Sequence, residues 1–233
     1  MIKICFVVPR AYYLFNPDTN NFSDKIGGAQ KQSYLLSTEL AKNKDFDVNF
    51  CVADFGQNNI EEIKNVKIWK SFNFKNSFLK KFLDLYRILK KINAEFYIFR
   101  ATDLSTSIIL MITRLILKKK IIYMVASDTE VCNKTNRKTI GFIGSLLMKF
   151  NYKQSYKITV QSAQQFSKFS ENYKRKPDST IKNIIETEEN QNITIRNNTL
   201  WIGRLDKIKN PYLVLELAEK FKTENFVMIA PVV

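Results

Sequence analysis

Residues 96–125 read FYIFRATDLSTSIILMITRLILKKKIIYMV, and in this stretch two short apolar runs flank a longer one. The runs Phe96–Arg100 and Lys120–Val125 have the length and the Ile, Phe and Tyr content of buried strands. Between them, Ser105–Leu117 is long enough for a helix. A strand, a helix and a second strand in this order predict a right-handed βαβ unit and therefore a parallel sheet.

The same alternation runs outward from this unit toward both ends of the chain. Further strands are predicted on the same grounds at Lys3–Pro9, Asp47–Ala53, Val66–Trp69 and Lys157–Val160. Apolar residues at helical spacing predict further helices at Ala29–Asn43, Ser77–Asn93, Thr139–Lys153 and Ser162–Asn172. The sequence therefore predicts an α/β fold, a doubly wound, Rossmann-like parallel sheet, over residues 1–186.

A second domain is predicted after a polar linker at residues 187–198. A strand at Thr199–Ile202, a helix at Pro211–Phe221 and a strand at Asn225–Ile229 form the first βαβ unit of another Rossmann-like domain, residues 199–233. One such unit cannot cover both faces of a parallel sheet. We therefore expect the rest of this domain to be missing or supplied elsewhere.

The composition excludes several classes of protein and of site. With 45% hydrophobic and 25% charged residues the 233-residue chain resembles an ordinary globular protein, which excludes a disordered or collagen-like one. There is no histidine, so no imidazole can act as base, acid or metal ligand. Three scattered cysteines suit neither a disulfide framework nor a zinc site, which indicates a reducing, cytoplasmic compartment and no metal. The longest apolar stretch, Ser107–Leu117, is too short to span a bilayer.

The positive charge is concentrated in the middle of the chain. Residues 64–157 carry 20 basic and 5 acidic side chains, against 6 and 8 before them and 11 and 9 after them. A one-sided field of this kind attracts anionic partners. The alternative is that a lysine-rich composition makes the surface basic without a specific partner.

Two glycines precede the first predicted helix, in the run Gly27-Gly28-Ala29-Gln30. Glycine lets the backbone approach a ligand, and the free N–H groups of a helix start favour an anion. An ordinary loop is the alternative. The three-glycine pattern of dinucleotide-binding folds is absent from the sequence.

A second cluster of polar residues follows the strand Thr199–Ile202. It reads Gly203-Arg204-Leu205-Asp206-Lys207-Ile208-Lys209-Asn210-Pro211, and the proline fixes the start of the next helix. In open α/β sheets, ligands bind beyond the carboxyl ends of the strands, where Arg204 and Lys209 would lie. The planar fork of arginine and the point charge of lysine suit a diphosphate.

These motifs resemble family 4 glycosyltransferases of the GT-B fold. The Gly-Arg…Lys-Asn-Pro run resembles the opening of the family's donor domain, and it is the more specific part. Gly27–Gln30, Phe96–Arg100 and Ile121–Asp128 resemble elements of its acceptor domain, so the resemblance spans most of the chain. It implies transfer of a sugar from a nucleotide-sugar, a substrate rather than a cofactor, to a glycan or lipid-linked acceptor in bacterial surface polysaccharide synthesis.

The resemblance also implies roles for individual residues. Arg204 and Lys209 would bind the donor diphosphate, together with the backbone at Gly27 and Gly28. Arg100 and Ser127 would lie on the acceptor side, and Asp128 would be the catalytic residue that orients the sugar hydroxyls. Many relatives have a histidine where this chain has Ala126-Ser127-Asp128, and capping of the next turn is the alternative role for Asp128.

The absence of histidine bears on the mechanism. An inverting transfer would need an Asp or Glu as base, whereas in a retaining transfer the departing diphosphate can take the proton. We therefore favour retention, with charge stabilisation by Arg204 and Lys209. Asp45-Phe46-Asp47 matches the metal-binding Asp-x-Asp of other glycosyltransferases, but it opens a strand at its amino end and is predicted to be a turn.

Members of this family continue for roughly another domain, which carries a pair of glutamates that grips the donor. The resemblance therefore implies that the chain ends within the donor domain. Either it is a fragment, or a partner chain completes the cleft, or it is a catalytically inactive acceptor-domain remnant or scaffold.

The positive charge suggests two further kinds of partner. The predicted helix Ser77–Asn93 combines an apolar stripe with basic residues that would suit an anionic membrane surface, on the inner face of the membrane: Lys80, Lys81, Arg87, Lys90 and Lys91. The alternative is a core-packing helix with a lysine-rich outer face. An isoelectric point near 9.6 also fits nucleic-acid binders, but the chain lacks their motifs and no nucleic acid is expected.

Overall fold

The computed structural model describes residues 1–17, 27–100, 104–185, 198–203, 205 and 209–230. The chain divides into two compact units, Met1–Ile185 and Glu186–Val233. The predicted α/β fold with a mainly parallel sheet is confirmed.

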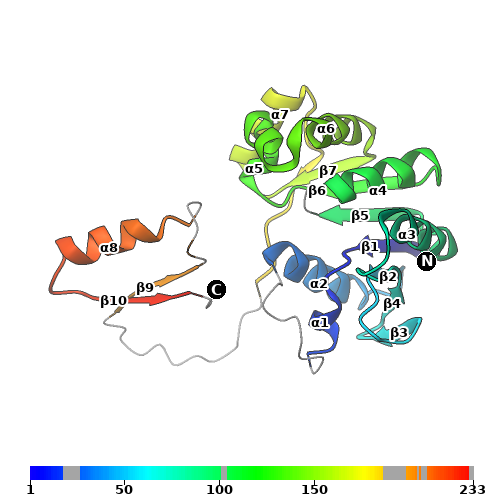
Figure 1. Ribbon diagram of the computed structural model, residues 1–233, viewed down its shortest axis with the longest axis horizontal. Helices are drawn as coiled ribbons and strands as arrows, with labels where there is room; N and C mark the ends of the chain where they lie inside the picture. Colours follow the sequence, from blue (N-terminus) through cyan, green and yellow to red (C-terminus); the bar gives the residue numbers. More distant parts are fainter. Residues whose placement is uncertain (18–26, 101–103, 186–197, 204, 206–208, 231–233) are drawn as a thin grey trace. The chain divides into compact units, whose positions relative to one another are not determined.

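The first unit is built on one sheet, in which the described residues form eight strands in the order β3-β4-β2-β1-β5-β6-β7-β8 (Figure 1). All neighbouring strands are parallel except β3 and β4. The strands are β1 (Ile2–Val7), β2 (Phe46–Val52), β3 (Ile60–Ile63), β4 (Val66–Lys70), β5 (Phe96–Arg100), β6 (Lys120–Met124), β7 (Lys157–Val160) and β8 (Ser179–Thr180).

Helices cover both faces of this sheet (Figure 1). Because strand side chains alternate between faces, Ile4 and Phe6 of β1 pack on one side while Cys5 and Val7 pack on the other. The first side carries α1 (Tyr12–Phe15) and α2 (Gly28–Leu40). The second carries α3 (Phe78–Ile92), α4 (Leu104–Leu115), α5 (Asp128–Val131), α6 (Asn133–Gln154) and α7 (Ala163–Tyr173).

The strand order reverses between β1 and β5. From β1 the chain continues to β2 on one side, whereas β5 lies on the other side and leads on to β6 and β7. The connections that leave the carboxyl ends of β1 and β5 therefore diverge. This switch point is where open α/β sheets bind their ligands.

Some elements differ from the sequence prediction. The strand β3 was not predicted, because its sequence Ile60-Glu61-Glu62-Ile63 has two carboxylates at its centre. The helix predicted from Thr139 begins earlier, at Asn133, and is broken at Gly141, whose φ is 74°.

The turn predicted at Asp45-Phe46-Asp47 is wrong in part, because β2 begins at Phe46 and includes Asp47. The Asp47 carboxylate pairs with Lys67 Nζ at 3.0 Å and with Lys3 Nζ at 3.6 Å. Its charge is thus compensated by two lysines at the amino end of the sheet.

The second unit consists of β9 (Asn198–Ile202), α8 (Pro211–Lys220) and β10 (Asn225–Ile229), and its two strands are parallel. The proline opens α8, as predicted. Four exposed apolar side chains share one face of this strand pair by register and alternation: Leu200, Ile202, Val227 and Ile229. Among the described residues, no helix is long and apolar enough to cross a membrane.

Candidate functional site

A cavity of about 310 Å³ lies in the first unit, at the switch point. Its floor is the carboxyl end of β1, from Val7 to Arg10, and the end of β5 at Arg100. The helices α3 and α4 form its sides. The remaining lining residues are Gln30, Phe72, Phe74, Phe78, Lys81, Phe82, Leu85, Ser105, Thr106, Ile108 and Ile109.

One wall of the cavity is aromatic. Phe72 and Phe74 follow β4 and pack edge to face, with ring centroids 5.4 Å apart. Phe74 also contacts Phe55 at 5.9 Å. The guanidinium of Arg10 lies 5.3 Å from the centroid of the Phe74 ring, as in a cation–π interaction. Arg10 is therefore held at the cavity by a ring that is itself packed.

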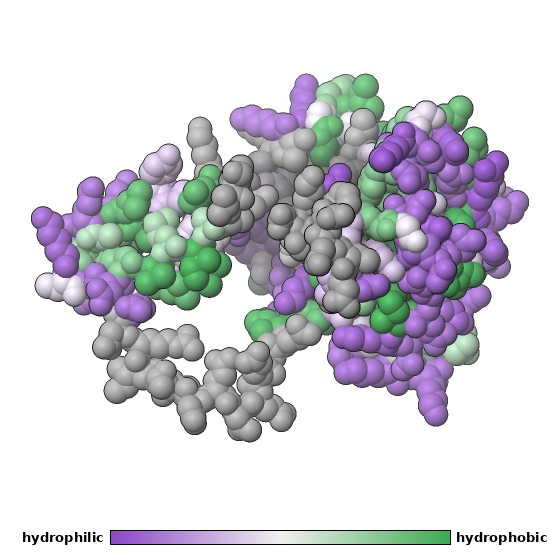
Figure 2. Space-filling view, turned by 60° about the horizontal axis from the view of Figure 1, so that its bottom comes forward, coloured by the Kyte–Doolittle hydropathy of each residue, from purple (hydrophilic) through white to green (hydrophobic). Residues whose placement is uncertain are grey.

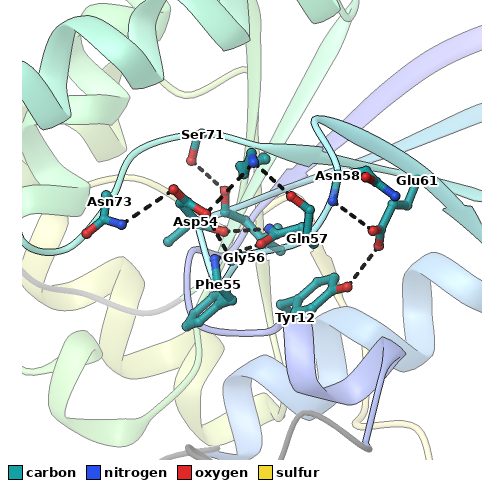
Figure 3. Close-up of polar contacts among 12 residues, drawn as sticks. Tyr12, Asp54, Phe55, Gly56, Gln57, Asn58, Glu61, Ser71 and Asn73 are labelled. Carbon is teal, nitrogen blue, oxygen red and sulfur yellow. Dashed lines mark hydrogen bonds and ion pairs between the residues drawn. The ribbon is translucent and has the colours of Figure 1, made fainter.

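A polar network fixes the loop that carries Phe55 (Figure 3). The Gln57 side chain accepts a hydrogen bond from Phe55 N at 2.6 Å and donates one to Ala53 O at 2.7 Å. Asp54 accepts from Gly56 N at 3.0 Å and from Asn73 Nδ2 at 3.4 Å. These bonds anchor the segments that follow β2 and β4 to each other, so the aromatic wall is preorganised.

Nearby, Tyr12 connects this loop region to α1 (Figure 3). Its hydroxyl donates to Glu61 Oε2 at 2.9 Å, and Glu61 Oε1 accepts from Asn58 N at 2.9 Å. The Tyr12 ring stacks on Phe55, with centroids 6.0 Å apart. The network therefore extends from the loop to the first helix of the chain.

Among the described residues, the charged side chains that line the cavity are cations: Arg10, Lys81 and Arg100. Arg100 Nη2 donates to Asn183 Oδ1 at 2.7 Å, and Arg100 Nε is buried with no hydrogen-bond partner among the described residues. Burial lowers the pKa of the Arg100 guanidinium, and the nearby Glu130 carboxylate opposes that shift. An anion in the cavity would stabilise these charges.

Arg100, predicted on the acceptor side, thus lines the cavity, but Ser127 and Asp128 do not. Ser127 Oγ lies 2.7 Å from Thr129 Oγ1 and 3.3 Å from Glu130 Oε1. The Asp128 carboxylate is exposed and accepts from Gln165 Nε2 at 2.9 Å. Asp128 is the first residue of α5, and Ser127 occupies the N-cap position. The catalytic role of Asp128 remains a prediction.

Sequence reasoning missed the buried Glu130 in this region. Its carboxylate accepts from the Tyr123 hydroxyl at 2.6 Å and from Ala126 N at 3.3 Å. It therefore holds the loop after β6, beside Ser127. Sequence reasoning also missed Arg10, although its place directly after a predicted strand was a usable signal, since ligands bind there.

The glycine pair lies at the start of α2, with Gly27 at the N-cap and Gly28 as the first helical residue. Gly27 N donates to Gln30 Oε1 at 3.1 Å. A Cβ atom on Gly28 would meet nothing within 4 Å, and as the first helical residue Gly28 has an N–H without an intrahelical acceptor. Gln30, two residues further on, lines the cavity.

The two cations predicted to bind the donor, Arg204 and Lys209, belong to the second unit. Lys209 is exposed there, and Arg204 lies outside the described residues. Gly203, beside it, is packed closely, because a Cβ atom would lie 3.0 Å from the Trp201 ring.

The predicted membrane helix differs from expectation in its apolar stripe. Leu85, Leu89 and Ile92 are buried in the core, and Phe82 lines the cavity. Phe78, the first residue of the predicted stripe, is instead 63% exposed, and so are the neighbouring Leu79 and Leu83, at 66% and 39%. From Leu85 onward the stripe is therefore a core-packing face, as the alternative interpretation has it.

The basic residues of α3 also divide into two groups. Lys80, Arg87, Lys90 and Lys91 are exposed, whereas Lys81, predicted for the same surface, is half-buried and lines the cavity. Lys81 is thus a cavity residue, because one turn of helix separates it from Leu85 on the inner face. Figure 2 shows hydrophilic residues over most of the visible face of the first unit, with smaller hydrophobic areas between them.

Comparisons with known proteins bear on the fold. No family model matches the chain, and no curated protein matches its sequence. Among solved structures, a sucrose-phosphate synthase from Thermosynechococcus elongatus matches with a TM-score of 0.59 and 10% sequence identity. The match covers 100% of this chain and 71% of that one. At this identity it shows that the two share a fold.

Proposed function

We propose that this chain is a glycosyltransferase that moves a sugar from a nucleotide-sugar donor to an acceptor bound in the first unit. The observation that carries the proposal is the cavity at the β1–β5 switch point, where three cations are among the described lining residues. The solved structure of similar fold supports it, since its name says that it makes sucrose phosphate. An enzyme that handles phosphorylated sugars needs cationic sites of this kind.

In this proposal residues 1–186 form the acceptor domain, residues 187–198 a linker and residues 199–233 the start of the donor domain. The donor diphosphate is bound by Arg204 and Lys209 and by the backbone at Gly27 and Gly28. Cations stabilise the negative charge that develops on the departing diphosphate. The reaction retains the configuration of the sugar, because the diphosphate then takes the proton and no histidine is required.

The acceptor occupies the cavity beside Arg100. Ser127 and Asp128, after β6, lie outside its lining, so in this proposal they contact the transferring sugar. The product belongs to a bacterial surface polysaccharide, and the exposed lysines of α3 hold the enzyme at the inner face of the membrane. The nucleotide-sugar is a substrate, and the proposal needs neither metal nor cofactor.

Calorimetry with a panel of nucleoside diphosphates tests the donor side. We expect one nucleotide to bind, and Lys209→Ala to weaken it about tenfold, the effect of one charge-assisted contact of ~1.4 kcal/mol. Lys222→Ala, which removes an exposed lysine outside the motif, is the matched control. If no nucleotide binds, the enzymatic proposal fails.

An inactive acceptor-domain scaffold is the second candidate. The exposed apolar face at Leu200, Ile202, Val227 and Ile229 favours it, since such a face is stabilised when another surface covers it. A scaffold would bind no nucleotide and release no diphosphate from any nucleotide-sugar, which separates it from the enzyme.

A further inference from the structure

The cavity combines an apolar lining with positive charge. Phe72, Phe78, Phe82, Leu85 and Ile109 give it hydrocarbon and aromatic surface. Arg10, Lys81 and Arg100 give it three cations, and no carboxylate is among its described lining residues. A ligand that matches both features has an anionic group joined to an apolar body.

The anionic group would lie where the cations meet the ends of β1 and β5. Arg100 Nε is a buried donor with no partner among the described residues, and a ligand oxygen would satisfy it. No ion pair with a described carboxylate engages Arg10 or Lys81. Arginine recognises phosphate through paired N–H groups, so phosphate is the anion that suits this site.

The apolar lining disfavours a free sugar as the occupant. A sugar needs a hydrogen-bond partner for each hydroxyl, and burying a hydroxyl without one is costly. Among the lining residues, Gln30, Ser105 and Thr106 are the neutral polar side chains. Burial of hydrocarbon against the phenylalanines is favourable instead.

The lining also continues to the surface. Phe78 belongs to the cavity and is 63% exposed, and the neighbouring Leu79 and Leu83 on α3 are exposed as well. The volume of about 310 Å³ is at the lower end for ligand sites, ~300–1,000 Å³. It holds a phosphate and the first part of a chain, and a longer chain would leave along α3.

We infer that the cavity binds a lipid phosphate, a phosphate monoester or diester of a long hydrocarbon alcohol. The phosphate contacts Arg10, Lys81 and Arg100, and the hydrocarbon lies along Phe78, Phe82 and Ile109. The role of this ligand as the sugar acceptor rests on the proposed function. Its binding in the cavity does not. Nucleotide binding in the absence of lipid, described above, tests the proposed function separately.

The test is calorimetric titration of the full chain with farnesyl phosphate, farnesol and inorganic phosphate, each below its aggregation concentration. We expect farnesyl phosphate to bind at least tenfold more tightly than either of the other two, because only it fills both parts of the cavity. Binding of farnesyl phosphate no tighter than that of inorganic phosphate would overturn the inference. So would equal binding of farnesol, since the cations would then contribute nothing.

Variants of two lysines separate the cavity from general surface charge. Lys81→Gln should weaken binding of farnesyl phosphate tenfold or more, whereas Lys168→Gln, which changes an exposed lysine of α7 outside the cavity, should leave it unchanged. Equal effects of the two substitutions would contradict the assignment. Arg100→Gln should weaken binding of farnesyl phosphate to a similar extent. If that variant fails to fold, the variant of the half-buried Lys81 still tests the site.

A bilayer arm distinguishes a monomeric ligand from membrane attachment. Vesicles of anionic phospholipid without any lipid phosphate should not compete with farnesyl phosphate for the cavity. Full competition by such vesicles would show that the cations serve a membrane surface instead, and the inference would be wrong.

Discussion

The Gln32 side chain and the backbone of Ile184 exchange two hydrogen bonds, although 152 residues separate them. Gln32 Nε2 donates to Ile184 O at 2.8 Å, and Ile184 N donates to Gln32 Oε1 at 2.7 Å. The adjacent Asn183 accepts from Arg100 Nη2 and donates to Gln161 Oε1 at 3.2 Å. One short segment thus fastens α2, β5 and the loop after β7 at the carboxyl edge of the sheet.

Gln32→Ala should therefore destabilise the first unit. Removing the amide leaves the N–H and C=O of Ile184 without these partners. A backbone group that stays buried without a partner lowers the free energy of unfolding by about 1–3 kcal/mol. Urea unfolding followed by far-UV circular dichroism measures the loss. Lys44→Ala changes an exposed side chain in the same connection between β1 and β2, and it should change the free energy of unfolding by less than ~0.5 kcal/mol. Equal stability of the two variants would contradict the role of the pair.

The three thiols should differ in reactivity. Cys5 and Cys51 are fully buried, and burial raises the pKa of Cys51 to about 12 and that of Cys5 well above its usual value. Only the thiolate reacts, and at pH 8 both groups are protonated. Cys132 is partly exposed. Iodoacetamide at pH 8 should label Cys132 first and the other two only upon unfolding, as mass spectrometry of peptides would show.

The two glycines Gly28 and Gly203 should respond differently to alanine. At Gly28 the new Cβ has open space in a helical position, so Gly28→Ala should keep or slightly raise stability, by ~0.4–1 kcal/mol. At Gly203 the Cβ lies 3.0 Å from the Trp201 ring, so Gly203→Ala should destabilise the second unit by ~1–3 kcal/mol. Tryptophan fluorescence during denaturation measures both.

The Gly28→Ala variant also tests the donor site. If a diphosphate approaches the backbone there, the added methyl group should weaken nucleotide binding in a protein of normal stability. Unchanged binding would remove Gly28 from the proposed site and leave the rest of it intact.

Asp178 should make folding sensitive to acid. Although desolvation by burial raises its pKa, hydrogen bonds from Lys157 Nζ at 2.9 Å and Ile158 N at 2.8 Å prevail, and the net pKa is lowered. A lowered pKa in the folded state gives stability that is present above the unfolded pKa of ~3.9 and lost as pH falls through the folded value. Asp178→Asn should therefore reduce the loss of stability below about pH 4, relative to wild type. Asp84→Asn, which removes an ion pair with the exposed Arg87, should cost less than ~1 kcal/mol at pH 7.

The sequence predicted the central strands well, because their pattern is local. The bounds of β5 and β7 agree with the apolar runs Phe96–Arg100 and Lys157–Val160. The edge strand β3 could not be found in this way, since only its antiparallel pairing with β4 makes Ile60-Glu61-Glu62-Ile63 a strand. When pairing with a neighbouring strand is what makes a segment a strand, its own sequence carries only a weak strand pattern.

The candidate site was less accessible to sequence reasoning. The family resemblance placed Arg100 on the acceptor side, which stays a prediction, and Lys81 was assigned to an outer surface although it lines the cavity. Which side of α3 faces inward depends on how the whole helix packs, and a broad apolar stripe does not fix its rotation to within one residue. The cavity itself is lined from β1, from α2, from the segment after β4 and from the successive elements α3, β5 and α4, which only the folded sheet brings together.

The two outermost strands bear on how the protein behaves in concentrated solution. One margin of the sheet is β3, short and marked by two glutamates, and the other is the two-residue β8. At either edge of the sheet, a strand from a second molecule has only a few residues to pair with. At the β3 edge it also meets the negative charge of two glutamates. We expect fibre growth through this sheet to be suppressed, so that any self-association proceeds through side-chain surfaces rather than through shared backbone ladders.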